Sequence, residues 1–235
     1  MRFEFNKLAL PALLICLASQ LSFAQTADQV ADFAKAAKFD NVSEVKSLLS
    51  KGVNPNTVDP NGNPMLLLAI KDNSNQVIDL LLSNPKTDVD LSNKSGETPL
   101  MIASIQGNLA LVKTLVLKNK AMLDHIGWTP LHYACAKGHL EVAEFLLANG
   151  ALVDSVSLNG TTPLMMAVQS GNEQLVKLLL DKGANLQLRN TQGLSAIDIA
   201  DIYDKPWIGD GLRSRWLKLY KQPYKGPVKP STSKS

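Results

Sequence analysis

A short motif centred on a single glycine recurs five times along this chain. The glycines are separated by 34, 31, 33 and 33 residues and stand at Gly62, Gly96, Gly127, Gly160 and Gly193. An apolar residue follows each glycine by four positions and an alanine by seven, as Leu131 and Ala134 follow Gly127. A period in this range indicates supersecondary units that bury their apolar faces by stacking on their neighbours.

The copy over residues 124–154 predicts two helices and a loop. Thr129 before Pro130 is typical of an N-cap followed by proline in the first helical turn, and Gly138 would end this short helix. Residues 140–147 then carry apolar side chains at the i, i+3, i+4 spacing of a helix with one buried face. The unit is a helix, a tight turn, a second helix and a protruding loop, which predicts an all-α repeat solenoid.

Here the sequence resembles the ankyrin repeat family. Residues 129–134, Thr-Pro-Leu-His-Tyr-Ala, reproduce the T-P-L-H-x-A motif of that family at every specified position. Residues 98–103 and 162–167 match it with methionine in place of histidine, whereas residues 64–69 and 195–200 lack the Thr-Pro pair. The resemblance implies a helix-turn-helix-loop stack of about six units with diverged N- and C-terminal caps.

The repeat period also predicts the domain organisation, because the resemblance extends over residues 28–200. We expect a signal peptide at 1–24, an N-terminal capping repeat at 25–57, full repeats at 58–90, 91–123, 124–156 and 157–189, a C-terminal capping repeat at 190–220, and a disordered Lys/Pro/Ser tail at 221–235. In the C-terminal cap, Leu212, Trp216 and Leu219 share one helical face. These three side chains are expected to close the last interface of the stack.

The first 24 residues have the layout of a cleavable secretory signal peptide. Arg2 and Lys7 precede an apolar run over residues 8–21, and residues 22–24, Ser-Phe-Ala, provide the small side chains of a cleavage site. The run of 14 residues is shorter than the roughly 20 that a membrane-spanning helix needs. We therefore predict a periplasmic or secreted protein with no integral membrane span after cleavage. A retained membrane anchor is the alternative.

Charge and motif content exclude several classes of function. The formal net charge is +3, and residues 221–235 contribute four lysines and no acid to it. A broad basic face of the kind that holds nucleic acid is therefore not expected, and we predict no nucleic-acid partner. The chain has no Gly-rich phosphate loop after a strand, no Ser/His/Asp arrangement in a suitable context and no paired carboxylates at a cleft. We therefore predict no enzyme activity and no cofactor.

The histidines and the cysteine have structural explanations in the repeat. The resemblance implies that His132 and His139 bond backbone groups within or between repeats, and because they lie in different elements no metal site is predicted. Cys135 is the only cysteine left after signal cleavage, and it stands where the repeat places a small buried residue. A thiol-dependent accessory role for Cys135 stays open as an alternative.

One loop is shorter than the others. Nine positions separate Ala151 from Gly160, and Ala184 to Gly193 is the same, but only six separate Ala121 from Gly127. The spacing predicts a truncated finger before the third full motif. The truncation would change where His125 and Trp128 project.

The resemblance implies a non-catalytic module that binds a protein partner through its loop tips and concave helix face. The residues that match those positions are Lys94, Glu97, Ile105, His125, Ile126, Trp128, Lys137, Leu158, Asn159, Thr161, Gln169, Gln192 and Leu194. Trp128 is the best single anchor, because tryptophan is enriched among residues that dominate binding energy. Packing of Trp128 between loops is the alternative. We expect a monomer. A second form of the binding hypothesis is that this chain is a protective or inhibitory partner of an envelope enzyme or toxin.

Overall fold

The computed structural model describes residues 25–226, and the predicted signal peptide at 1–24 lies outside them. In chain order the helices are α1 (Ala27–Lys38), α2 (Val42–Ser50), α3 (Met65–Lys71), α4 (Asn75–Ser83), α5 (Pro99–Ile105), α6 (Leu109–Lys113), α7 (Pro130–Ala136), α8 (Leu140–Ala148), α9 (Pro163–Ser170), α10 (Glu173–Asp181), α11 (Ala196–Ile202) and α12 (Pro206–Tyr220). A π-helical turn, η1 (Thr114–Lys118), continues α6. Within residues 25–226 no helix is both long and apolar enough to cross a bilayer.

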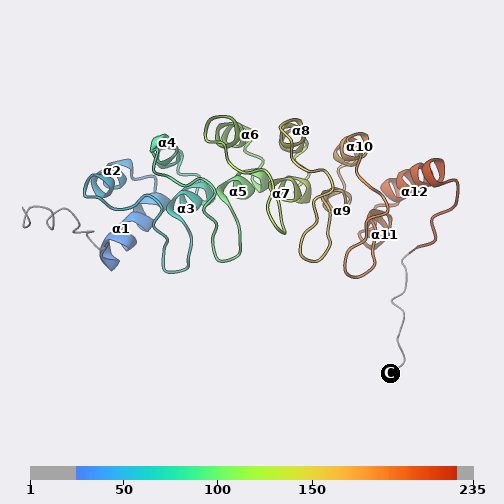
Figure 1. Cartoon of the computed structure of the whole chain (residues 1–235), viewed down its shortest axis with the longest axis horizontal. Helices are drawn as coiled ribbons and strands as arrows, with labels where there is room; N and C mark the ends of the chain where they lie inside the picture. Colours follow the sequence, from blue (N-terminus) through green and yellow to red (C-terminus); the bar gives the residue numbers. More distant parts are fainter. Residues whose placement is uncertain (1–24, 227–235) are drawn as a thin grey trace, which may run out of the picture.

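The helices form one elongated, gently curved stack (Figure 1). Helices α3, α5, α7, α9 and α11 form an inner row, and α4, α6, α8 and α10 form an outer row beside it. The loops between repeats project from the inner row, on the side away from the outer helices, as a series of fingers. The predicted all-α repeat solenoid is therefore confirmed.

The inner helices begin where the motif predicts them. The side chains of Thr98, Thr129, Thr162 and Ser195 each accept a hydrogen bond from a backbone N–H in the first helical turn. Such caps satisfy donors that the helix itself leaves unpaired, and each contributes about 1 kcal/mol. At the degenerate first copy, Pro64 supplies no side-chain cap to α3.

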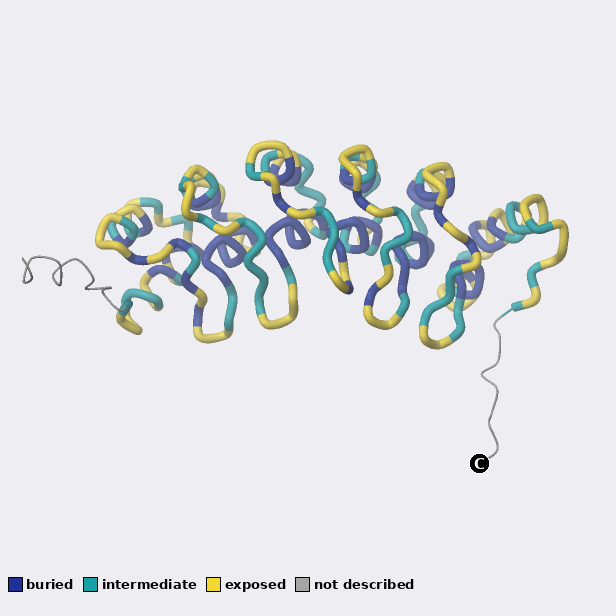
Figure 2. The backbone as a smooth tube through the Cα atoms, viewed as in Figure 1, coloured by how far each residue is buried: buried dark blue, intermediate teal, exposed yellow. Residues whose placement is uncertain are grey.

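The core is a continuous band that comprises the inner row and the side of the outer helices that faces it (Figure 2). The alanine seven positions after each repeat glycine is fully buried in all five copies: Ala69, Ala103, Ala134, Ala167 and Ala200. A methyl group at this position lets neighbouring inner helices approach closely, and the leucines around it fill the space between them. The stack is therefore stabilised by packing between repeats, because one helix pair cannot bury its apolar face alone.

The C-terminal cap differs from the prediction in one residue. Leu212 is buried and Trp216 packs against the core, but Leu219 is 56% exposed. Ile208, one turn before Leu212, is buried in its place. The face of α12 that covers the last repeat is therefore drawn from its first three turns, and the prediction for Leu219 is wrong.

The segment after α12 is held by an aromatic contact that the sequence prediction missed. The ring of Tyr224 meets that of Trp216 edge-on at 5.1 Å, and its hydroxyl is hydrogen-bonded to Ser195 (2.6 Å) and Asp198. Arg189 lies over the same ring and donates to the carbonyl of Gly226 (3.1 Å). Placing a disordered tail from residue 221 is therefore wrong for residues 221–226, and residues 227–235 lie outside the described part.

Candidate functional site

Each full-length finger is a tight hairpin closed by the same two backbone hydrogen bonds. In the finger that contains Gly160, Ser157 N–H donates to the Thr161 carbonyl (3.0 Å) and Gly160 N–H donates to the Ser157 carbonyl (2.8 Å). The equivalent pair occurs at Gly62, Gly96 and Gly193. A polar residue three positions before the glycine opens each of these hairpins, at Asp59, Asn93, Ser157 and Asn190.

The finger at Gly127 lacks this hairpin, and among the described residues neither bond of the pair occurs there. In a neighbouring repeat, Asp154 accepts a hydrogen bond from Asn185 N–H (3.0 Å) and stands six positions before the repeat glycine. Asp124 makes the equivalent bond with Leu152 N–H (3.2 Å), but it stands only three positions before its glycine. The three missing residues are therefore those that would build the hairpin. The predicted truncated finger is confirmed.

An apolar hollow lies on the concave face beside the finger that lacks the hairpin. The hollow has a volume of about 200 Å³ and is lined by Ile105, Trp128, His132, Tyr133 and Ala136. Trp128 is 37% exposed and meets the rings of His132 (5.3 Å) and Tyr133 (6.4 Å) edge-on. These aromatic contacts lie within its own repeat, and they fix the indole beside the hollow.

Two exposed apolar side chains lie at the tips of two adjacent fingers. Ile126 is 96% exposed and Leu158 is 85% exposed. The two tips are adjacent, because a Cβ placed on Gly127 would lie 3.6 Å from Leu158 Cγ. We call the hollow together with Ile126 and Leu158 the apolar notch. Exposed apolar side chains gathered in one region of the surface are typical of a protein-binding site.

The predicted contact residues Lys94 and Glu97 have partners inside the chain. Glu97 accepts hydrogen bonds from Lys71 (2.9 Å) and Asn93 (2.8 Å), and Tyr133 O–H lies 3.5 Å from it. Partial burial opposes ionisation of Glu97, but the bonds from Lys71 and Asn93 outweigh it and hold the pKa of Glu97 below its usual value. Lys94 covers Gly62 of the preceding finger, where a Cβ would lie 2.6 Å from its side chain.

The remaining predicted contact residues divide by exposure. The exposed ones are Lys137, Asn159 and Gln192, and the half-buried ones are Ile105, His125, Gln169 and Leu194. Thr161 is buried, and its carbonyl accepts a hydrogen bond from His132 Nε2 (2.9 Å), so the outward placement predicted for Thr161 is wrong. Sequence reasoning also missed Tyr133. The available signal was that Tyr133 is the only aromatic residue at the x position of the five motifs.

The two motif histidines bind backbone carbonyls of neighbouring repeats. His132 Nε2 reaches Thr161, and His139 Nε2 reaches the Ile105 carbonyl at 2.9 Å. Burial lowers the pKa of His132 to about 4. Residues 25–226 contain no cluster of three or more histidine, cysteine or acidic side chains that could hold a metal ion.

Cys135 has no accessible surface, and burial raises the pKa of its thiol. A thiolate is the reactive form of cysteine, and this environment opposes both its formation and its contact with a reagent. The geometry therefore opposes a role for Cys135 as a surface thiol.

Comparison with known proteins defines the class of this chain. The family profile described as ankyrin repeats (3 copies) matches residues 33–122 and 118–190. The chain therefore belongs to the ankyrin repeat family, whose repeats are typical of modules that bind other proteins.

Relatives with this repeat differ widely in length. The chain is 30% identical over 161 residues to transient receptor potential cation channel subfamily A member 1 of Homo sapiens, covering 64% of this chain and 14% of that protein. It is 32% identical over 175 residues to nuclear factor NF-kappa-B p105 subunit of Gallus gallus, covering 71% of this chain and 18% of that protein. Over 179 residues it is 29% identical to putative ankyrin repeat protein YahD of Escherichia coli, covering 72% of this chain and 88% of that protein. The chain thus spans less than a fifth of the first two relatives and most of the third.

Proposed function

We propose that this chain is a non-catalytic module that binds a protein partner through its concave face, with the apolar notch as the centre of contact. The single observation that carries the proposal is the coincidence of the truncated finger with the hollow beside Trp128. The neighbouring fingers each present a closed hairpin, whereas this repeat presents an opening lined by apolar side chains.

The notch has the composition of a binding hot spot. Tryptophan and tyrosine in a desolvated pocket are the residue types whose truncation most often costs 2 kcal/mol or more of binding free energy. Trp128 and Tyr133 are already held in place, Tyr133 by its approach to Glu97 and Trp128 by the two edge-on ring contacts. Little side-chain entropy remains to be lost on docking, which favours affinity.

Residues 1–24 also support a proposal for where the protein is located. A basic start, an apolar run and a Ser-Phe-Ala site favour export to the periplasm or to the medium. The bound partner would then be an envelope or secreted protein. Masking an envelope enzyme or a toxin would use the same face, and assay of the captured partner with and without this chain distinguishes that role from simple binding.

Replacement of Trp128 by alanine tests the proposal. We expect Trp128→Ala to weaken capture of the partner from envelope extract, and then binding of the purified partner, at least tenfold. The fall in the thermal unfolding midpoint should be modest, because the indole is already partly exposed to solvent. Phe39→Ala is the matched control, since Phe39 is an exposed aromatic residue directly after α1, and α1 lies well away from α7 in the stack (Figure 1). Unchanged capture by Trp128→Ala would refute the proposal, and so would a loss of capture explained by a large fall in the unfolding midpoint.

A further inference from the structure

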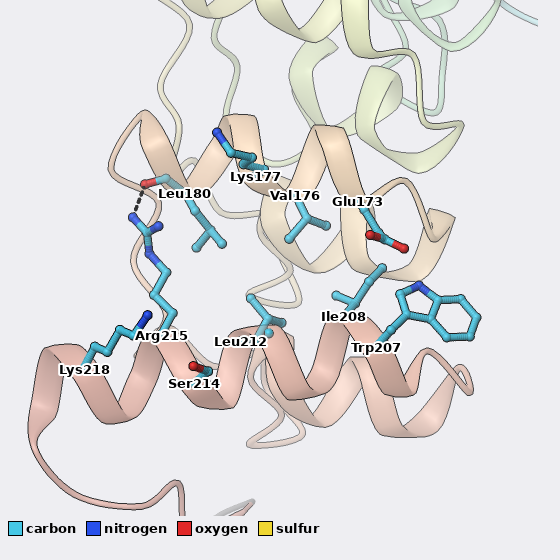
Figure 3. A pocket seen from close by; sticks show the side chains of 11 residues that line it. Glu173, Val176, Lys177, Leu180, Trp207, Ile208, Leu212, Ser214, Arg215 and Lys218 are labelled. Atoms are coloured by element: carbon cyan, nitrogen blue, oxygen red, sulfur yellow. Dashed lines mark hydrogen bonds between the residues drawn. The ribbon is translucent and has the colours of Figure 1, made fainter.

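A second apolar opening lies between α10 and α12, which we call the C-terminal groove (Figure 3). Its volume is about 370 Å³, and its floor is formed by Val176 and Leu180 of α10 with Ile208 and Leu212 of α12. Trp207 stands at one end of the groove and is 55% exposed. This opening uses an outer helix and the terminal helix, whereas the apolar notch uses the fingers and the inner helices.

Gly211 lines the groove in the middle of α12, and nothing inside the chain requires a glycine there. Its backbone is helical, and a Cβ at this position would meet no atom within 4 Å. Gly209 is different, because a Cβ there would lie 2.9 Å from the Arg213 side chain and 3.4 Å from Ala200. Glycine in a helix interior is unfavourable relative to alanine, and close approach of another backbone is one of its uses. At Gly211 the wall of the groove therefore carries no side chain, and another backbone can approach the helix closely there.

The two ends of the groove carry opposite charge. Glu173 lies beside Trp207 at one end, and Lys177, Arg215 and Lys218 lie toward the other (Figure 3). Asp181 pairs with Lys177 (2.7 Å) and approaches Arg215 (3.6 Å). Within the part of the chain that the structure describes, neither Glu173 nor Lys218 forms an ion pair. The charge at the rim of the groove therefore changes from negative beside Trp207 to positive beside Lys218. A second copy turned end for end would place its Lys218 near Glu173 of the first.

The sequence of α12 is self-complementary in that orientation. When two copies of the helix cross antiparallel about the bond between Leu212 and Arg213, Gly211 of each lies opposite Ser214 of the other. The same register places Trp207 opposite Lys218. Small residues thus meet at the crossing point, and a lysine meets an aromatic ring at each end.

We propose that the C-terminal groove is a homodimer interface in which α12 of each copy lies in the groove of the other. The two-fold arrangement covers Trp207, pairs Lys218 of each copy with Glu173 of the other, and uses the space that Gly211 leaves open. A crossing of two helices of 15 residues belongs at the small end of the range of specific interfaces, which begins at about 1,200 Å² in total. The dimer is therefore weak and depends on concentration. It replaces the monomer expected from sequence.

Sedimentation velocity of the whole chain tests the proposal, over protein concentrations from about 1 to about 200 µM. We expect the weight-average mass to rise from that of one chain toward twice that value. Lys218→Glu and Glu173→Lys should each remain monomeric, because each places like charges at both ends of the interface. An equimolar mixture of the two variants should dimerise again, since every contact then joins opposite charges. Glu144→Lys, on the exposed side of α8, should dimerise like the unmodified chain.

Gly211→Ala supplies a readout that a folding defect cannot imitate. The substitution should raise the thermal unfolding midpoint of the dilute chain, because alanine favours the helix, and should lower the fraction of dimer. A mass equal to one chain at every concentration would overturn the proposal. A dimer that persists in both charge variants, or a mixture of them that stays monomeric, would also overturn it. Trp128→Ala leaves this groove intact, so it should dimerise normally whatever its effect on partner capture.

Discussion

Acidification should destabilise the fold through one buried imidazole, that of His132. Nε2 of His132 faces the Thr161 carbonyl at 2.9 Å, and because a carbonyl only accepts, Nε2 carries the proton. Nδ1 then accepts from Thr129, whose backbone N–H lies 3.2 Å away. The neutral ring satisfies both partners, whereas a second proton would set the Nδ1–H against the Thr129 N–H.

The size of the effect follows from the pKa of His132. Burial lowers this pKa from 6.5 to about 4, so between these values the unfolded chain binds a proton that the folded chain does not. The free energy of unfolding therefore falls as pH decreases through this window. Each pKa unit of difference between the folded and the unfolded chain corresponds to about 1.4 kcal/mol. The free energy of unfolding is therefore lower by about 2 kcal/mol at pH 5 and by about 3 kcal/mol below pH 4. The contribution of His132 to the pH dependence fades above pH 6.5 and is negligible about one unit higher, where the unfolded chain no longer binds the proton either.

His132→Met isolates this contribution, because Met101 and Met165 occupy the same buried motif position in the flanking repeats. Urea unfolding followed by circular dichroism at pH 7 and pH 5 gives the change in unfolding free energy for each protein. The unmodified chain should lose about 2 kcal/mol more than the variant between the two pH values. Equal losses in the two proteins would show that His132 is not held neutral and would refute the reasoning.

Three further predictions follow from individual contacts. Cys135 should react slowly with a thiol reagent in the folded chain and rapidly in urea, and fast labelling of the folded chain would contradict its burial. Gly160→Ala should lower the free energy of unfolding by at least about 1 kcal/mol more than Gly150→Ala, measured by urea unfolding. Both glycines have positive φ, but only at Gly160 would a Cβ meet backbone, at 2.9 Å from Asn190 Cα. Tyr224→Phe should cost about 1–2 kcal/mol by the same measurement, since it removes a hydroxyl bonded to Ser195 and the buried Asp198. A neutral effect would mean that the segment after α12 does not hold the last repeat.

The repeat architecture could be predicted because its determinants are local and are repeated. The caps at Thr98, Thr129 and Thr162, and the alanine seven positions after each glycine, lie within one turn or one helix of the residues they serve. The short finger could be predicted for a different reason. A missing stretch of three residues is visible by comparison with the other copies of the same chain.

The features that were missed depend on residues far apart in the sequence. Tyr224 meets Ser195 and Trp216 across the turn after α12, and no periodic pattern places it there. Thr161 is buried because its carbonyl meets His132 of the preceding repeat, so its exposure depends on a neighbour and not on its place in the motif. The C-terminal groove arises where α12 departs from the repeat, and a pattern derived from the repeat contains no information about it.

Restoring the missing hairpin tests the central claim most directly. Insertion of Ser-Val-Ser between Asp124 and His125 gives this finger the spacing of residues 154–160, with a serine three positions before the glycine. The measurement is the affinity of the captured partner for this variant and for the unmodified chain, with circular dichroism to establish that both are folded. We predict that the insertion variant folds and binds at least tenfold more weakly, because a closed hairpin covers the approach to Trp128. A folded insertion variant that binds its partner as tightly as the unmodified chain would contradict the account.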